Sequence, residues 1–184
     1  SYRGGYGYGG VRALQADIGG EEPMKQVHPI PPLYSENSRV LILGSFPSVK
    51  SREQGFFYGH PQNRFWRVTA AVTGCPVPQT VEEKRKFILD NRLALWDVIA
   101  ECEITGSSDS SIKNVVPNDI NLILTACDIR AVFVNGRTAE KYYIKYAEPF
   151  TGIKAVCLPS TSPANAAWSL ERLCGEWKII KNYI

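Results

Sequence analysis

The sequence predicts an α/β fold, a three-layer α/β/α sandwich with a central, mostly parallel four-stranded sheet. Four apolar runs have the length and composition of strands buried on both faces, at residues 40–43, 93–99, 131–134 and 154–158. Segments in which apolar residues recur at helical spacing lie between these runs. Strands that alternate with helices form a parallel sheet with helices packed on both of its faces.

Each element has its own local signal. The first run, Val40-Leu41-Ile42-Leu43, is apolar throughout and stops at Gly44. Helices are expected at residues 63–73, 81–91, 117–126, from 136 to about 147, and 165–181. The polar segment 103–114 is expected to be a loop. Because ligands bind beyond the carboxyl ends of parallel strands, the expected site lies in the loops 44–63, 135–136 and 159–165.

The beginning of the chain differs in composition from the rest. Residues 1–10 read SYRGGYGYGG, which is too rich in glycine to pack into a core. The sole methionine, Met24, stands just before the regular part of the sequence. Residues 1–23 are therefore expected to be a disordered or foreign extension, and residues 24–184 a single domain.

The composition excludes several classes of protein. No apolar run reaches the roughly 20 residues that cross a bilayer, and the start shows no secretory signal, so a cytoplasmic protein is expected. The five cysteines are widely spaced without a CxxC pair, and there are only two histidines. Disulfides, a metal and a cofactor are therefore not expected. The net charge of +3 is too small to indicate nucleic acid by itself.

The loop after the first strand is the least ordinary part of the chain. Residues 44–66 read GSFPSVKSREQGFFYGHPQNRFW. Aromatic side chains beside cationic ones suit stacking on a nucleobase and contact with phosphates. The aromatic residues are Phe46, Phe56, Phe57 and Tyr58, and the cationic residues are Lys50, Arg52 and Arg64. The alternative is that the aromatic rings seal the end of the sheet as part of the core.

Residues 55–66, GFFYGHPQNRFW, resemble the mismatch-specific uracil/thymine glycosylases of the uracil-DNA glycosylase superfamily. In that family a Gly-x-Asn-Pro loop continues into Gly-Phe-x-Phe-x-His-Pro-x-Asn-Arg-Phe-Trp. The second motif of the superfamily, a Pro-Ser-rich loop after the last strand, is present as LPSTSP at residues 158–163. The two motifs anchor about residues 39–180. The resemblance implies the superfamily's fold and a DNA glycosylase that flips a damaged base out of the duplex.

Two positions depart from the usual pattern. The first motif normally carries Asp or Asn two residues after its glycine, where this chain has Phe46, and a phenyl ring can neither position nor activate water. The histidine that begins the second motif in strict uracil enzymes is replaced by Leu158. A sequence that lacks both of these residues but keeps His-Pro-x-Asn resembles the hypoxanthine-DNA (deoxyinosine) glycosylase branch of the superfamily. There the critical polar residue lies in that segment, which implies Asn63 as the catalytic residue.

The resemblance also implies roles for the residues around Asn63. The base would be bound by the segment Gly44, Ser45, Phe46 and Pro47 through the backbone amides that follow Gly44, by stacking on Tyr58, and by Asn135 at its edge. Asn63 would orient water or bond the base, although it could equally cap the helix that follows, and Asn135 could belong to a simple turn. Further DNA contacts are expected from Ser48, Lys50, His60, Ser160, Thr161 and Ser162, the last three of which could instead form a solvated turn.

The expected reaction is hydrolysis of the glycosidic bond of hypoxanthine, which leaves an abasic site. No lysine is marked as a Schiff-base nucleophile, so strand cleavage is not expected. DNA is the expected partner, and a monomer is expected because one copy can engage one lesion. The stretch Ser162-Pro-Ala-Asn165 offers no bulky side chain to fill the gap left by a flipped base.

Other readings remain open at this point. A glycosylase for uracil or for G·T and G·U mismatches is the first alternative. A non-catalytic DNA-binding module of the same fold is the second, because Phe46 removes the usual polar group. Residues 44–51 also approach the phosphate-binding pattern GxxxxGK[ST], but Val49 replaces its second glycine and Pro47 removes a backbone donor.

Overall fold

A computed structural model describes residues 22–105 and 109–184. Its centre is a four-stranded sheet in the order β3-β2-β6-β7. All three neighbouring pairs are parallel. The strands are β2 (Val40–Gly44), β3 (Leu93–Asp97), β6 (Ala131–Asn135) and β7 (Val156–Leu158). Every residue of β2 and β3 is buried, as expected for strands covered on both faces.

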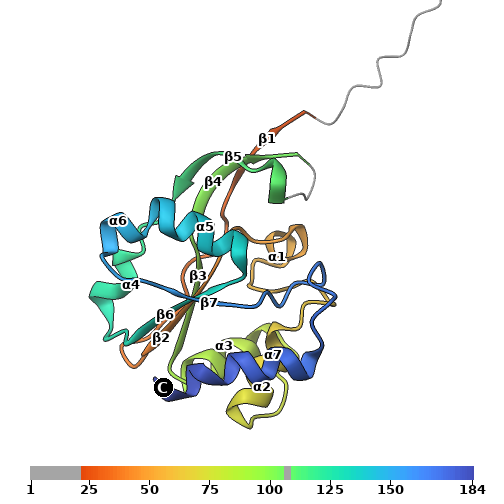
Figure 1. The fold of residues 1–184 in the computed structure, drawn as a ribbon, viewed down its shortest axis with the longest axis vertical. Coiled ribbons are helices and arrows are strands. Elements are labelled where there is room, and N and C mark those ends of the chain that lie inside the picture. Colours follow the sequence, from red (N-terminus) through yellow and green to blue (C-terminus); the bar gives the residue numbers. More distant parts are fainter. Residues whose placement is uncertain (1–21, 106–108) are drawn as a thin grey trace, which may run out of the picture.

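Helices cover the two faces of this sheet, so the predicted three-layer sandwich is confirmed (Figure 1). One layer contains α2 (Phe65–Thr73), α3 (Val81–Asp90) and α7 (Leu170–Trp177). The other contains α4 (Asn121–Ala126), α5 (Arg137–Tyr146) and α6 (Glu148–Thr151). Local sequence sets several boundaries. For example, Thr80 and Glu83 form a capping box at the start of α3, and Gly74 ends α2 in the left-handed conformation.

A second, antiparallel sheet was not predicted. It has the order β1-β4-β5 and consists of β1 (Met24–Val27), β4 (Ile99–Ile104) and β5 (Lys113–Pro117). The expectation of a loop at residues 103–114 is therefore wrong at both ends of that segment, and η1 (Asp109–Ser111) lies within it. β1 and β5 are short and largely exposed, so they show little of the hydrophobic alternation on which strand prediction depends.

Several predicted boundaries also shift. The run 93–99 is divided at Val98, and the loop 44–63 contains a short helix, α1 (Val49–Gln54). The helix expected from residue 117 begins at Asn121, because Pro117 is the last residue of β5. The helix expected from residue 165 begins at Leu170, where Ser169 caps it. It continues after Trp177 as a 3₁₀ helix, η2 (Lys178–Asn182).

The predicted extension at residues 1–23 lies almost wholly outside the described residues. Within the described part, β1 begins at Met24, the residue at which the domain was expected to start. No helix among the described residues combines the length and apolar character needed to cross a membrane.

Candidate functional site

The carboxyl ends of the four parallel strands bring distant parts of the chain together. Gly44 lies beside Asp97 across the β2–β3 pair, and Asn135 lies beside Leu158 across the β6–β7 pair. The loops that follow β2 and β7 contain the two sequence motifs. This edge is where ligands bind in open parallel sheets, so the structure assembles the predicted site in the expected place.

The loop after β2 presents backbone donors. The carbonyl oxygens of Gly44 and Ser45 accept hydrogen bonds from Val98 (2.9 Å) and Ile99 (3.0 Å), which fix the loop against the end of β3. Within the described residues, the amides of Ser45 and Phe46 donate to no protein acceptor. They are therefore available to a ligand, as in other sites where backbone amides stabilise developing negative charge.

Gly44 is required by close packing. A Cβ atom at this position would lie 2.3 Å from Oδ1 of Asp97 and 3.5 Å from the Tyr58 hydroxyl. The absence of a side chain thus allows a carboxylate and a phenol to approach the backbone at the start of the loop.

Asn63 is held by its side-chain oxygen. Oδ1 accepts hydrogen bonds from the backbone amide of Phe65 (2.9 Å) and from Oγ1 of Thr161 (2.8 Å). Because the Phe65 amide can only donate, this bond fixes which end of the carboxamide is oxygen. Asn63 Nδ2 donates to no residue in the described part of the chain. The N-cap of α2 is Arg64, without a side-chain cap, so the predicted capping role of Asn63 is wrong in position. Asn63 precedes the cap and accepts from the first residue of α2, and its carboxamide nitrogen remains available.

A buried hydrogen-bond network connects Asn63 to Asn135. Thr161 Oγ1, which donates to Asn63, also accepts from Asn135 Nδ2 (3.0 Å), and the Thr161 amide donates to Asn135 Oδ1 (3.0 Å). Thr161 is 0 % exposed. We therefore expect Thr161 to order the two asparagines rather than to touch a phosphate directly.

The second-motif loop is anchored to α2 by Arg64. Its backbone amide donates to the carbonyl of Thr161 (3.0 Å). Its guanidinium donates to carbonyls of the same loop, those of Ser162, Asn165 and Trp168. The two motifs are thus parts of one rigid unit, although about a hundred residues separate them.

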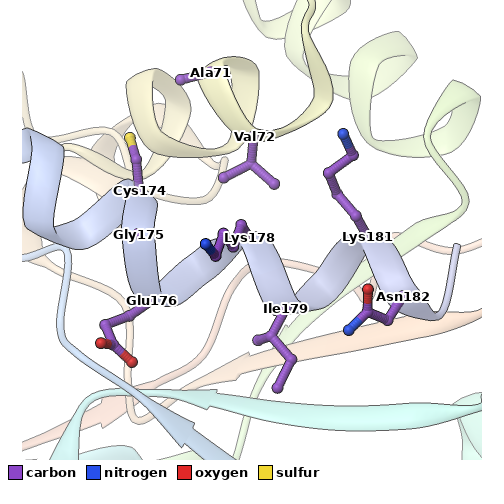
Figure 2. Close-up of a pocket in the computed structure, with 9 residues that line it drawn as sticks. All are labelled: Ala71, Val72, Cys174, Gly175, Glu176, Lys178, Ile179, Lys181 and Asn182. Atoms are coloured by element: carbon purple, nitrogen blue, oxygen red, sulfur yellow. The ribbon is translucent and has the colours of Figure 1, made fainter.

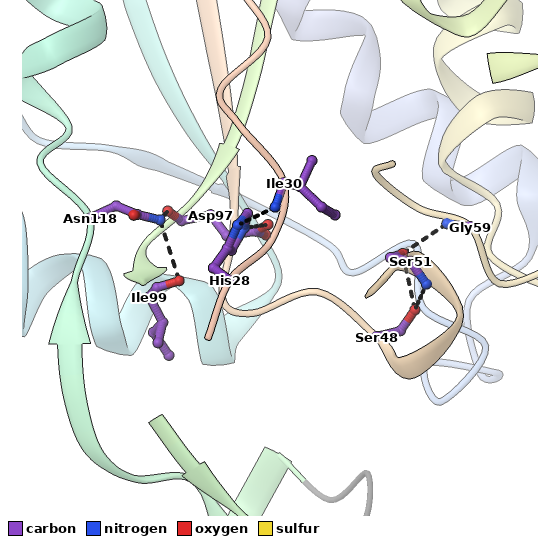
Figure 3. Close-up of polar contacts among 8 residues, drawn as sticks. All are labelled: His28, Ile30, Ser48, Ser51, Gly59, Asp97, Ile99 and Asn118. Atoms are coloured by element: carbon purple, nitrogen blue, oxygen red, sulfur yellow. Dashed lines mark hydrogen bonds and ion pairs between the residues drawn. The ribbon is translucent and has the colours of Figure 1, made fainter. Parts of the chain in front are cut away.

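Tyr58 lies at the centre of the site in a strained backbone conformation. Its φ of 50° is in the left-handed region, which is uncommon for a bulky residue and often marks a functional constraint. Its ring stacks on Phe65, with centroids 4.0 Å apart, so one ring face is covered by protein. Ser51 accepts a hydrogen bond from the amide of the next residue, Gly59 (2.9 Å), and so ties this segment to α1 (Figure 3).

The hydroxyl of Tyr58 is buried and has no hydrogen-bond partner among the described residues. Burial raises the pKa of this phenol far above its usual range, and the nearby Asp97 carboxylate raises it further, while the Asn135 side chain acts in the opposite direction. The phenol is therefore uncharged and can donate a hydrogen bond.

The other loop aromatics divide into two groups. Phe56 and Phe57 are only 2 % and 3 % exposed and belong to the core, so they fit the sealing role that was the alternative prediction. Phe46 is half-buried, with the Arg52 guanidinium 5.4 Å from its ring centroid.

The remaining predicted residues lie around the site with varied exposure. Lys50 is exposed and pairs with Glu53 at 3.6 Å, whereas Pro47 is buried. Ser48 caps α1 by accepting from the Ser51 amide (3.1 Å). Side chains of three others accept hydrogen bonds from nearby backbone amides and are half-buried, namely His60, Ser160 and Ser162. Their contacts with DNA stay predictions.

The site also contains a buried hydrogen-bonded pair, His28 and Asp97, that the sequence did not predict. His28 Nε2 lies 2.7 Å from Asp97 Oδ2, and the two side chains are 2 % and 7 % exposed (Figure 3). Asp97 ends an apolar strand, as Gly44 and Asn135 do. The sequence did not single out Asp97, because the predicted strand continued to Ile99 and so placed Asp97 inside it. His28 had no local signal, since its contact with Asp97 spans 69 residues.

Two hollows lie in the described part of the structure, and neither is lined by Tyr58, Asn63 or Asp97. One, of about 710 Å³, lies between α2 and the end of the chain and includes Val72, Cys174 and Ile179 in its lining (Figure 2). The other, of about 940 Å³, lies between β1 and α1. Within the described residues, no group of three metal-ligating side chains is arranged around a common point.

The fold and the site define an α/β/α protein with a uracil-DNA-glycosylase-like architecture. Residues 31–182 match the family model of the uracil DNA glycosylase superfamily. The chain therefore belongs to the uracil DNA glycosylase superfamily.

Relatives and a solved structure agree with this assignment. A hypoxanthine DNA glycosylase of Methanosarcina acetivorans is 36 % identical over 155 residues, which cover 82 % of this chain and 94 % of the relative. Another, from Methanosarcina barkeri, is 32 % identical over 140 residues, 73 % of this chain and 85 % of the relative. The solution NMR structure of a candidate uracil DNA glycosylase from Methanosarcina acetivorans matches with a TM-score of 0.73 at 33 % identity, covering 85 % of this chain and 96 % of that one.

Proposed function

We propose that this protein is a monofunctional DNA glycosylase that hydrolyses the N-glycosidic bond of hypoxanthine in DNA and leaves an abasic site. The observation that carries the proposal is the state of Asn63, whose oxygen is fixed by two donors while its Nδ2 is left free at the carboxyl edge of the sheet. The names of the two relatives support hypoxanthine as the base.

The proposed mechanism uses donors rather than a base. As the glycosidic bond breaks, negative charge develops on the leaving base and positive charge on the sugar, so donors aimed at the base stabilise the transition state. Asn63 Nδ2 and the amides of Ser45 and Phe46 are such donors. A carboxamide is not a proton acceptor of useful strength, so water adds after the base has largely departed. The phenyl ring of Phe46 fits this mechanism, since it activates no water.

DNA would cross the outer surface of the two motif loops. Ser48, Lys50, His60, Ser160 and Ser162 surround the site and would contact phosphates. Flipping would then place the base near the amides after Gly44 and the ring of Tyr58. One copy of the chain supplies every residue named here, which favours a monomer.

The test is a panel of duplex oligonucleotides that carry inosine, uracil, xanthine or a G·T mismatch. The expected result is release of free hypoxanthine and an abasic site that breaks only after alkali. Duplex binding without release of any base would refute the proposal and favour the non-catalytic module. Faster release of uracil than of hypoxanthine would favour the second candidate, a uracil glycosylase, which the likeness to a candidate uracil DNA glycosylase also supports.

A further inference from the structure

The His28–Asp97 pair has no role in the mechanism above, yet it lies within the site. His28 Nδ1 accepts a hydrogen bond from the Ile30 amide (3.2 Å), so that nitrogen carries no proton. The ring proton is therefore on Nε2, which donates to Asp97 Oδ2 at 2.7 Å (Figure 3). The histidine is a neutral donor that holds the carboxylate in one orientation.

The second oxygen of Asp97 faces the start of the loop after β2. Oδ1 fills the space beside the Gly44 Cα atom, as the 2.3 Å distance to an added Cβ shows. Among the described residues, no donor is bonded to this oxygen. The free amides of Ser45 and Phe46 begin one residue further along the chain. A strong acceptor and free donors thus lie close together at the start of this loop.

This arrangement matches the chemical change that deamination makes in a base. Adenine and cytosine present a ring nitrogen with a lone pair beside an amino group. Deamination replaces this edge by a ring N–H beside a carbonyl, which exchanges donor and acceptor. A carboxylate can only accept and a backbone amide can only donate. The Asp97 carboxylate and the loop amides therefore complement the deaminated edge. With adenine or cytosine the carboxylate would face the lone pair of the ring nitrogen, and the amides would face the amino group.

We propose that Asp97, oriented by His28, is a specificity-determining residue that accepts the ring N–H of a deaminated base while the loop amides donate to its neighbouring carbonyl. The inference rests on the proposed glycosylase function. It explains rejection of adenine and cytosine but not of guanine, which presents the same N–H and carbonyl. The depth of Asp97 also favours contact with the edge of the base over contact with water at the sugar.

The test compares inosine with 1-methylinosine, which lacks the ring N–H, as substrates of the full chain. The wild type is expected to release the base of inosine at least 10-fold faster, because a hydrogen bond to a charged group is lost with the methylated base. D97A is expected to be about 10- to 100-fold slower on inosine and to treat the two substrates within a few-fold of each other. D97N keeps the size of the side chain and is expected to lower the ratio of the inosine rate to the 1-methylinosine rate. It therefore tests the role of Asp97 if D97A does not fold.

His28 is tested as a positioning residue. H28A is expected to lower the inosine to 1-methylinosine ratio, and H28Q, whose amide can donate to Asp97, is expected to restore part of it. N118A is the matched control, because Asn118 bonds the backbone carbonyl of Asp97 (2.9 Å) and not its carboxylate. Its stability should fall while its substrate ratio stays that of the wild type.

The outcomes separate the inference from the function on which it rests. If the wild type releases no base from any oligonucleotide, the proposed function fails. If the wild type is active and a folded D97N or D97A keeps the wild-type ratio, the inference alone is overturned. If an Asp97 variant loses excision rate equally on inosine and 1-methylinosine, the inference is also overturned, because that pattern indicates a role in water activation.

Discussion

Replacing Asn63 by alanine separates its structural role from its chemical one. The substitution removes the acceptor for the Phe65 amide and for the Thr161 hydroxyl. Losing the hydrogen bond to the Phe65 amide costs about 1 kcal/mol, and a buried hydroxyl left without its acceptor adds about 1–2 kcal/mol. The free energy of unfolding should therefore fall by about 2–3 kcal/mol. Loss of a donor aimed at the leaving base should lower the excision rate by about 100- to 1000-fold.

The assay is single-turnover excision from a fluorophore-labelled inosine duplex, read as alkali-dependent strand breakage at a temperature where both proteins are folded. S169A is the control for loss of a side-chain bond at a helix start, because Ser169 caps α7 by accepting from the Arg172 amide (3.1 Å) away from the site. This control should lose stability and keep its excision rate. The reasoning is refuted if folded N63A excises hypoxanthine within about threefold of the wild-type rate.

N63D sharpens the experiment. A carboxylate can accept both hydrogen bonds that Asn63 Oδ1 accepts, but it has no N–H to donate. N63D should therefore unfold near the wild-type temperature and still lose most of its excision rate. A fully active N63D would assign catalysis to the side-chain oxygen instead of the nitrogen.

Three further changes test the surroundings of Asn63. T161V should lower the free energy of unfolding by about 1–3 kcal/mol, measured by urea denaturation, because it leaves Asn135 Nδ2 without its buried acceptor. G44A should slow excision by at least about tenfold, since its Cβ would displace the Asp97 carboxylate that lies 2.3 Å away; an unchanged rate contradicts the packing argument. The raised pKa of Tyr58 means that its contribution to stability is complete below its unfolded pKa of about 10 and is lost as pH rises above that value. Y58F should therefore resist alkaline unfolding better than the wild type in pH-dependent melting curves, with little change near pH 7.

Local sequence signals predicted the parallel core well, because a buried strand depends on neighbours along the chain, whereas the role of the first motif stays a prediction. The all-apolar run ending at Gly44 indicated a buried strand, and the segment 55–66 indicated Asn63 directly. The antiparallel sheet escaped prediction for the opposite reason. β1 and β5 are short and exposed, so their pairing with β4 is decided by contacts that no local pattern records.

The sequence by itself determined the layered α/β architecture, and it predicted the edge at which a ligand is expected to bind and the residue types present there. Only the tertiary structure decided how those residues act on one another. It joined Thr161 to Asn63 across 98 residues and His28 to Asp97 across 69. Both contacts are buried, and a buried polar group must find a partner wherever the fold provides one. Which partner it finds depends on how the strands and loops meet in space, and the order of residues along the chain does not contain that information locally.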